Sequence, residues 1–191
     1  MFCNRHTAYS IYSDFMIQYI LLDLSGHSQR GADRLRIVVF SDSHNNFFVL
    51  KNIVIKQATA DLFLHLGDGE REFQNLCEMF PEKFMRGVRG NCDWCSTGKL
   101  SDLVSIAGKR VFFTHGHAYG VKSGLGDLAR GAESQNADIV LYGHTHIAVC
   151  EYRDGVHYMN PGSVTSPQLG SASYGVVDIT GAGIVTNIVN L

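Results

Sequence analysis

Short apolar runs alternate with segments of helical periodicity along most of the chain. Residues 36–41 (RIVVFS) and 62–66 (LFLHL) are β-rich runs without polar alternation, which is typical of strands buried on both faces of a sheet. Between them, residues 46–60 carry apolar side chains at helical spacing. This alternation predicts a layered α/β domain.

The later segments continue the pattern. A second helix is predicted over residues 70–80, and a third over residues 120–137, where three glycines lower the helix propensity. Further strands are predicted over residues 83–88, 103–107, 110–114, 139–142, 156–159, 173–179 and 183–189.

Polar clusters follow five of these predicted strands, each at the point where the apolar run ends. They are Asp42-Ser43-His44, Gly67-Asp68-Gly69, Gly90-Asn91-Cys92-Asp93, His115-Gly116-His117 and Gly143-His144-Thr145-His146. Ligands of open α/β sheets bind where strands end at their carboxyl edge, so the clusters indicate one shared site. Side chains two residues apart in extended backbone point the same way, which suits paired metal ligands.

Taken singly, each cluster has a structural alternative. Asp42 is also a suitable cap for the following helix, and Asp68 and Asn91 are also common turn residues. Cys92 and Cys95 form a C-x-x-C pair, which is found in redox dithiols and in half of some zinc sites. The sequence has no second C-x-x-C to complete a zinc site.

Composition narrows the function further. The 191 residues are 45% hydrophobic, enough for one core, and sixteen Lys and Arg against eighteen Asp and Glu give a net charge of −2. This balance argues against a broad nucleic-acid or anionic-membrane surface. The five cysteines are odd in number and no secretory signal is apparent, so we expect a cytoplasmic protein with free thiols. Residues 11–24 are apolar but too short, with Asp14 and Asp23, to span a membrane.

In this order, the five clusters resemble the signature of the calcineurin-like metallophosphoesterase superfamily: D-x-H, G-D, G-N-H with a following acid, H, and G-H-x-H. The cluster at Asn91 and the later Asn160-Pro161-Gly162-Ser163 look like its small bacterial and archaeal phosphodiesterase branch, which is related to a eukaryotic retromer subunit. The resemblance covers nearly all of residues 36–191. It implies a four-layer α/β sandwich, two mainly mixed β-sheets flanked by helices, with a dimetal site at the strand-end loops.

The resemblance also implies the ligands of two divalent metal ions. The ligands implied for the first ion are Asp42, His44, Asp68 and His146. The ligands implied for the second are Asp68, Asn91, His115 and His144. Asp68 would bridge the ions, and a metal-bridging hydroxide would attack a small phosphate ester in line, most readily a phosphodiester.

Three catalytic roles follow from the same resemblance, for Asn91, Cys92 and His117. Asn91 would stabilise charge on the phosphoryl group. Cys92 stands where relatives have a general-acid histidine, and a thiol, with an ordinary pKa of about 8.5, is a poorer proton donor at neutral pH. His117, two residues beyond a ligand, would contact the substrate, orient a ligand or supply the proton in place of Cys92; the alternative is that it simply faces water.

The donor set favours manganese, with iron, zinc, nickel or cobalt as alternatives, because it mixes imidazole, carboxylate and amide groups. The alternative function is a non-catalytic, metal-binding scaffold for protein interaction on the same fold. Every ligand position holds a competent residue, which favours an enzyme. The sequence does not decide the oligomeric state, and a homo-oligomer is one of the alternatives.

The resemblance divides the chain into an N-terminal extension, residues 1–34, and a metallophosphoesterase domain, residues 35–191. Two hypotheses account for the extension. One is a gene-start artefact, with translation beginning at Leu35. The other is a docking segment, in which the apolar residues 11–24 cover a surface of the domain or of a partner.

Overall fold

The central strand of the first sheet is β1 (Arg34–Phe40), whose apolar run is buried on both faces. The computed structural model describes residues 34–191, and in these the first sheet has the order β10-β9-β1-β2-β3. β1 pairs in parallel with β2 and antiparallel with β9, so the sheet is mixed. Its other strands are β2 (Leu62–His65), β3 (Met85–Gly87), β9 (Ser173–Thr180) and β10 (Gly183–Asn190).

The second sheet is also mixed and five-stranded, with the order β4-β5-β6-β8-β7. Its three inner strands are parallel to one another and its two edge strands are antiparallel to their neighbours. The strands are β4 (Ser101–Ile106), β5 (Lys109–Thr114), β6 (Ile139–Tyr142), β7 (Ala148–Arg153) and β8 (Val156–Pro161).

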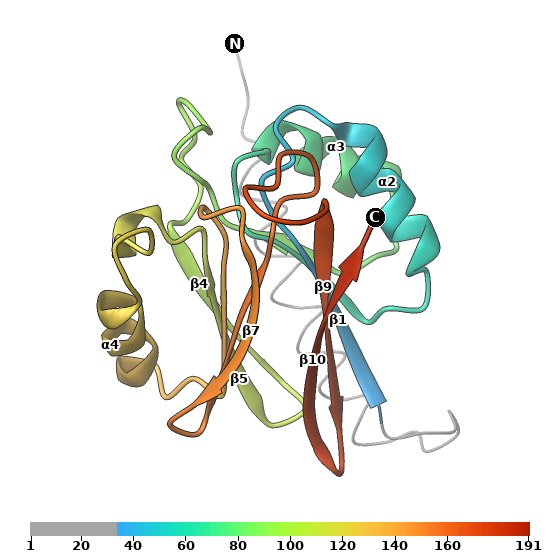
Figure 1. The fold of residues 1–191 in the computed structure, drawn as a ribbon. Coiled ribbons are helices and arrows are strands. Elements are labelled where there is room, and N and C mark those ends of the chain that lie inside the picture. Colours follow the sequence, from blue (N-terminus) through green and yellow to red (C-terminus); the bar gives the residue numbers. More distant parts are fainter. Residues whose placement is uncertain (1–33) are drawn as a thin grey trace. The chain divides into compact units, whose positions relative to one another are not determined.

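Helices cover the outer face of each sheet (Figure 1). α2 (Phe47–Lys56) and α3 (Glu70–Met79) bury Leu50 and Leu76 in a cluster with Phe40 of β1. α4 (Gly126–Ser134) packs on the second sheet, in a separate apolar cluster. Each helix thus buries one apolar stripe, as an amphipathic surface helix does.

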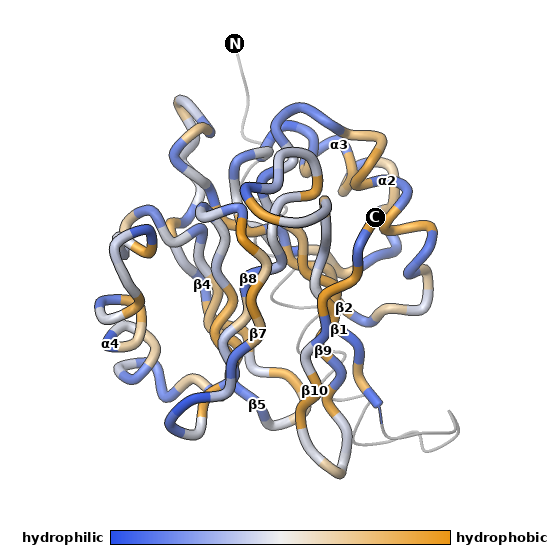
Figure 2. Tube along the Cα trace, in the orientation of Figure 1, coloured by the Kyte–Doolittle hydropathy of each residue, from blue (hydrophilic) through white to orange (hydrophobic). Residues whose placement is uncertain are grey.

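The two sheets face each other, because β8 and β9 are in contact. Gly175 of β9 lies so close to β8 that a Cβ atom at this position would overlap the sulfur of Met159. Hydrophobic stretches lie along strands of both sheets, while the loops between them are mainly hydrophilic (Figure 2). The predicted four-layer α/β sandwich, helices on sheet on sheet on helix, is therefore confirmed.

The element boundaries differ from the sequence predictions where local contacts decide them. The helix predicted over residues 46–60 begins at Phe47, and its cap is Asn46, whose side chain accepts the Val49 N–H, rather than Asp42. The third helix is shorter than predicted: a 3-10 turn, η1 (His117–Tyr119), precedes α4, and a left-handed Gly124 separates them.

The hypotheses on the N-terminal extension concern residues outside the described part of the chain and stay predictions. Within residues 34–191, no helix has the length and apolar character needed to cross a bilayer.

Replacing Gly175 by valine is expected to lower the free energy of unfolding by about 1–3 kcal/mol, because the added side chain overpacks the contact between the sheets. Intrinsic strand propensity alone predicts the opposite, since valine is a better strand residue than glycine. Denaturant titration measures the difference. Gly181→Val is the control, because a Cβ there meets open space. A Gly175→Val protein as stable as the wild type would contradict this packing.

Candidate metal centre

Five strands from both sheets end at the same edge, and the loops that follow them carry all seven predicted metal ligands. β1 and β2 of the first sheet lead to Asp42 and Asp68, while β5 and β6 of the second lead to His115 and His144. Backbone hydrogen bonds tie these loops together: Asp42 N–H donates to Gly67 O at 3.0 Å and Gly143 N–H donates to His115 O at 3.1 Å. The edge is thus one connected surface.

The backbone at most of these ligands is left-handed, a conformation uncommon for residues other than glycine. The φ angles are +57° at Asp42, +42° at His44, +56° at Asp68, +67° at His144 and +58° at His146. Such strain concentrates at functional sites, where it turns side chains toward a common point.

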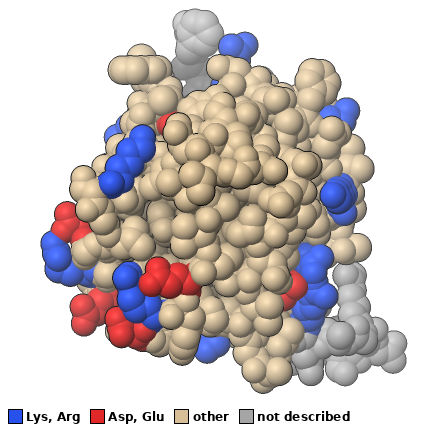
Figure 3. Space-filling view, viewed as in Figure 1, with Lys and Arg blue, Asp and Glu red and all other residues tan. Residues whose placement is uncertain are grey.

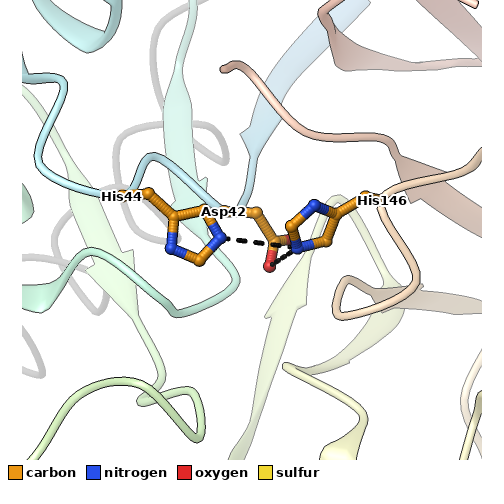
Figure 4. A group of neighbouring side chains, drawn as sticks. All are labelled: Asp42, His44 and His146. Atoms are coloured by element: carbon orange, nitrogen blue, oxygen red, sulfur yellow. Dashed lines mark hydrogen bonds and ion pairs between the residues drawn. The ribbon is translucent and has the colours of Figure 1, made fainter. Parts of the chain in front are cut away.

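The first ligand group is Asp42, His44 and His146, whose side chains point toward one another (Figure 4). His146 Nε2 lies 3.0 Å from Asp42 Oδ1 and 3.4 Å from His44 Nε2. His146 Nδ1 lies 2.7 Å from Ser166 O, and because a carbonyl only accepts, Nδ1 carries the hydrogen. In a neutral ring, Nε2 then turns a lone pair toward the carboxylate, an arrangement that a shared cation stabilises.

The second group has the same property. His115 Nδ1 donates to Leu66 O at 2.8 Å, which leaves a lone pair on Nε2 of the neutral ring. That atom lies 3.1 Å from Asn91 Oδ1, 3.2 Å from His144 Nδ1 and 3.4 Å from Asp68 Oδ2. Two oxygens and a second imidazole nitrogen therefore lie within 3.4 Å of His115 Nε2, although the group whose ligand atoms all lie within 4.8 Å of one another contains Asp42, Asp68 and His115 and not His144.

Asp68 lies between the two groups. One carboxylate oxygen of Asp68 lies within 4.8 Å of ligand atoms of Asp42 and His115. A carboxylate oxygen of Asp68 also lies within 4.8 Å of a ring nitrogen of His44. The carboxylate thus has the reach that a bridge between two ions needs. Imidazole nitrogens, carboxylates and an amide oxygen also match the donors of divalent transition ions, so the residues present fit a metal pair.

The electrostatics of the metal-free protein agree with this geometry. Burial works to lower the pKa of His115, but the carboxylates of Asp68 and Asp42 outweigh it and raise that pKa. Asp42 likewise raises the pKa of His146 through their hydrogen bond. Although burial opposes ionisation, the pKa values of Asp42 and Asp68 are lowered by these histidines. Protons therefore occupy the positions that cations would take.

Cys92 and His117 also lie beside the ligands. The Cys92 N–H donates to Asp68 Oδ1 at 2.7 Å, while burial and the Asp68 carboxylate raise the pKa of the Cys92 thiol to about 11. The His117 ring lies 5.3 Å from that of His115, and its buried Nδ1 has no hydrogen-bond partner among the described residues. Burial and the His115 charge lower the pKa of His117, so the ring is neutral at pH 7.

Asp93 supports the candidate ligands through hydrogen bonds to the backbone. From the sequence it was recognised only as the acidic residue of the Gly90-Asn91-Cys92-Asp93 cluster, and these bonds were not predicted. Its carboxylate accepts four backbone N–H groups, those of Asp68, Gly69, Glu70 and Gly90, at 2.7–2.9 Å. Two of these N–H groups belong to Gly69, the N-cap of α3, and to Glu70, its first residue, where backbone N–H groups lack partners within the helix. Asp93 thus caps α3 and fastens the Asn91 loop to Asp68.

The turn from Asn160 to Ser163 supports the ligand loops from the second sheet. Asn160 Nδ2 donates to Gly143 O at 2.9 Å, and the Ser163 hydroxyl donates to Asp42 O at 2.9 Å. Thr165 donates to the same carbonyl at 3.0 Å. The turn therefore supports the loops that carry Asp42 and His144.

Comparison with known proteins identifies the chain's relatives. Residues 35–182 match the family described as the calcineurin-like phosphoesterase superfamily domain. The probable metallophosphoesterase YsnB of Bacillus subtilis is 33% identical over 136 residues, which are 71% of this chain and 78% of YsnB. The phosphodiesterase YfcE of Escherichia coli K12 is 39% identical over 100 residues, 48% of this chain and 50% of YfcE.

Solved structures share the fold. That of a predicted phosphoesterase from Streptococcus pneumoniae TIGR4 superposes with a TM-score of 0.74 at 25% identity, covering 82% of this chain and 90% of that one. Vps29 of Cryptosporidium parvum superposes with a TM-score of 0.69 at 19% identity, covering 83% and 92%. The second likeness concerns the fold alone.

Binding of a divalent ion is expected to strengthen as the pH rises from about 6 to 8. The raised pKa values of His115 and His146 place protons on the nitrogens that an ion needs, so the ion must displace them. Affinity should fall as the pH drops through these pKa values, with protons released on binding. Calorimetric Mn²⁺ titrations in two buffers of different ionisation enthalpy measure both effects. A pH-independent affinity without proton release would contradict the assignment of these ligands.

Proposed function

Because the chain belongs to the calcineurin-like phosphoesterase superfamily, we propose that it is a dimetal-dependent phosphoesterase acting on a small phosphodiester. The observation that carries the proposal is the convergence of lone pairs at two adjacent points, around His146 Nε2 and His115 Nε2. Both arrangements are unfavourable unless a proton or a metal ion lies between these atoms, and a carboxylate oxygen of Asp68 lies near ligand atoms of His44 and His115. A structural role alone would not require such convergence.

We assign Asp42, His44, Asp68 and His146 to one ion, and Asp68, Asn91, His115 and His144 to the other. Two divalent ions bring more positive charge than the Asp42 and Asp68 carboxylates remove, so the loaded pocket is positive. Lys122 adds to this, since its charge already lowers the pKa of His144. The pocket can therefore attract a phosphate although the chain as a whole has a net charge of −2. The mixed nitrogen and oxygen donors favour manganese.

When bound, two such metal ions would supply an activated water and stabilise charge on a phosphoryl group. The chain's own residues fix the geometry. The Leu66 and Ser166 carbonyls orient the rings of His115 and His146, and hydrogen-bonded partners of this kind fix both the tautomer and the direction of a ligand ring. We propose that Asn91, whose Nδ2 donates to Cys92 Sγ at 3.3 Å in the metal-free protein, would donate an amide hydrogen to a phosphoryl oxygen of the substrate.

Delivery of a proton to the leaving group is the weaker half of the mechanism. Cys92 stays a thiol at neutral pH because its pKa is raised to about 11, and His117 is neutral because its pKa is lowered. Neither is a strong acid near pH 7. We therefore propose that the protein prefers substrates whose leaving group departs without full protonation.

The preference for a diester rests on similarity to YfcE, which is a phosphodiesterase and matches over about half its length.

A non-catalytic scaffold is the alternative, supported by the fold shared with Vps29. It would not require a complete ligand set, yet here all seven positions hold donor side chains. Figure 3 shows a face where charges of both signs lie scattered around an uncharged centre, which suits a small substrate better than a polynucleotide. Cytoplasmic location and oligomeric state stay predictions.

Hydrolysis is expected to disappear when metal is stripped and to return with Mn²⁺. Asp68→Ala should lower the restored kcat/KM by more than about 100-fold, because a shared ligand matters more than the supporting residues whose loss costs about 10–100-fold. The measurement is hydrolysis of bis(p-nitrophenyl) phosphate and of p-nitrophenyl phosphate with each divalent ion. Glu82→Ala, an exposed acid on the described surface, is the control. If no ion raised hydrolysis above that of Asp68→Ala, the scaffold alternative would hold.

Replacing Cys92 by histidine is expected to raise the hydrolysis rate of an alkyl phosphodiester by up to about 100-fold, the low end of what a positioned general acid contributes. A nitrophenyl diester should gain far less, because its leaving group needs little protonation. The paired rates, measured from pH 6 to 9, separate the two cases. Equal effects on both substrates, with an unchanged pH profile, would show that position 92 has no part in proton transfer.

A further inference from the structure

α3 carries a buried acid, Glu72, that belongs to none of the converging ligand groups of the described residues. Its side chain is 5% exposed. Oε1 accepts the Ser43 hydroxyl at 3.0 Å and the backbone N–H of Asn45. One carboxylate oxygen thus holds the two residues that flank the metal ligand His44.

The turn that Glu72 holds is strained. His44 and Asn45 are consecutive left-handed residues, with φ of +42° and +68°, and neither is glycine. Such a conformation is uncommon for residues that carry a Cβ atom and persists only where the surroundings fix it. The Asn45 N–H donates to Glu72 Oε1, so without the Glu72 carboxylate it would lose this partner.

A buried histidine fixes Ser43 from the other side. Gly67 N–H donates to His65 Nδ1 at 3.3 Å, so the ring hydrogen of neutral His65 lies on Nε2, which is 3.4 Å from Ser43 Oγ. The ring stacks on Phe73 of α3 at a centroid distance of 5.0 Å, and burial lowers the pKa of His65 to about 4. The hydrogen bonds therefore run in one direction, from Gly67 through His65 and Ser43 to Glu72.

The surroundings leave this network little freedom. A Cβ atom at Gly69 would overlap Ser43 Oγ and lie 2.9 Å from Glu72 Oε1. Ser43 and His65 are both fully buried. A buried network with every member satisfied rigidifies what it contacts, and here the contact is the backbone on both sides of a ligand.

We propose that Glu72, through Ser43 and the Asn45 N–H, is a positioning residue that holds His44 toward Asp42 and His146 and so sets the affinity of that ligand group for its divalent ion. This proposal rests on the proposed function, because it assumes that the protein binds divalent ions at these ligands. It separates two tasks within α3: the first turn, capped by Asp93, orients Asp68, and Glu72 orients the loop of the other ligand group.

The test is calorimetric titration of metal-stripped protein with Mn²⁺, together with thermal unfolding without metal. Glu72→Ala should weaken one of two Mn²⁺ binding events by about 10- to 100-fold and leave the other near its wild-type value. Glu72→Gln should recover most of the loss, because its amide oxygen accepts the same two hydrogen bonds. Glu78→Ala is the matched control, since Glu78 is an exposed acid on the same helix, and it should change nothing.

A folded Glu72→Ala protein with wild-type Mn²⁺ affinity would overturn the proposal, even if its melting temperature fell, because the role would then be structural only. If Glu72→Ala does not fold, Ser43→Ala decides, since it removes a single hydroxyl: weaker Mn²⁺ binding supports the proposal and wild-type binding overturns it. Wild-type protein that binds no Mn²⁺ would overturn the proposed function itself, a result distinct from an unaffected variant.

Discussion

Convergence of electron-rich atoms at one edge of two sheets is the constraint on which the rest of the structure depends. Lone pairs on carboxylate oxygens and imidazole nitrogens repel one another unless a proton or a metal ion lies between them, and several such pairs are 3.0–3.4 Å apart. The backbone reaches this arrangement only through left-handed residues such as Asp42 and His146. The two sheets must also keep a fixed position relative to each other, because each carries candidate ligands of the site. The close contact of Gly175 with Met159 is therefore as relevant to the site as any ligand.

A second shell of hydrogen bonds counters this repulsion and strain. Asp93 gathers four N–H groups around Asp68, Glu72 holds the turn around His44, and Asn160 holds the loop before His144. These acceptors and donors satisfy main-chain groups that an irregular buried loop would otherwise leave without partners. The positions of the candidate ligands therefore depend on residues outside the candidate ligand set, so loss of such a residue is expected to affect metal affinity as well as stability.

The sequence predicted the parts of this structure that local pattern encodes. Strands such as residues 139–142 were found with their observed bounds because burial on both faces produces an unbroken apolar run. The ligand positions followed from polar clusters at strand ends. The supporting contacts were not predictable, because they join residues far apart in the chain: Thr165 and Asp42 are separated by 123 positions. Helix ends were missed for a different reason: they are set by local backbone features, such as the Asn46 cap and the positive φ of Gly124, which periodicity does not reveal.

Charge balance gives the site an order of assembly. Without ions, the Asp42 and Asp68 carboxylates are offset only by protons on His115 and His146, and these protons become fewer as the pH rises. A phosphate would then meet a pocket with little positive charge, in a chain whose net charge is −2. Two divalent ions reverse the sign of the pocket, because they exceed the ligand carboxylates in charge. Under the proposed function, substrate affinity would therefore depend on metal loading, and the role that we propose for Glu72 would also set how much of the protein can bind phosphate.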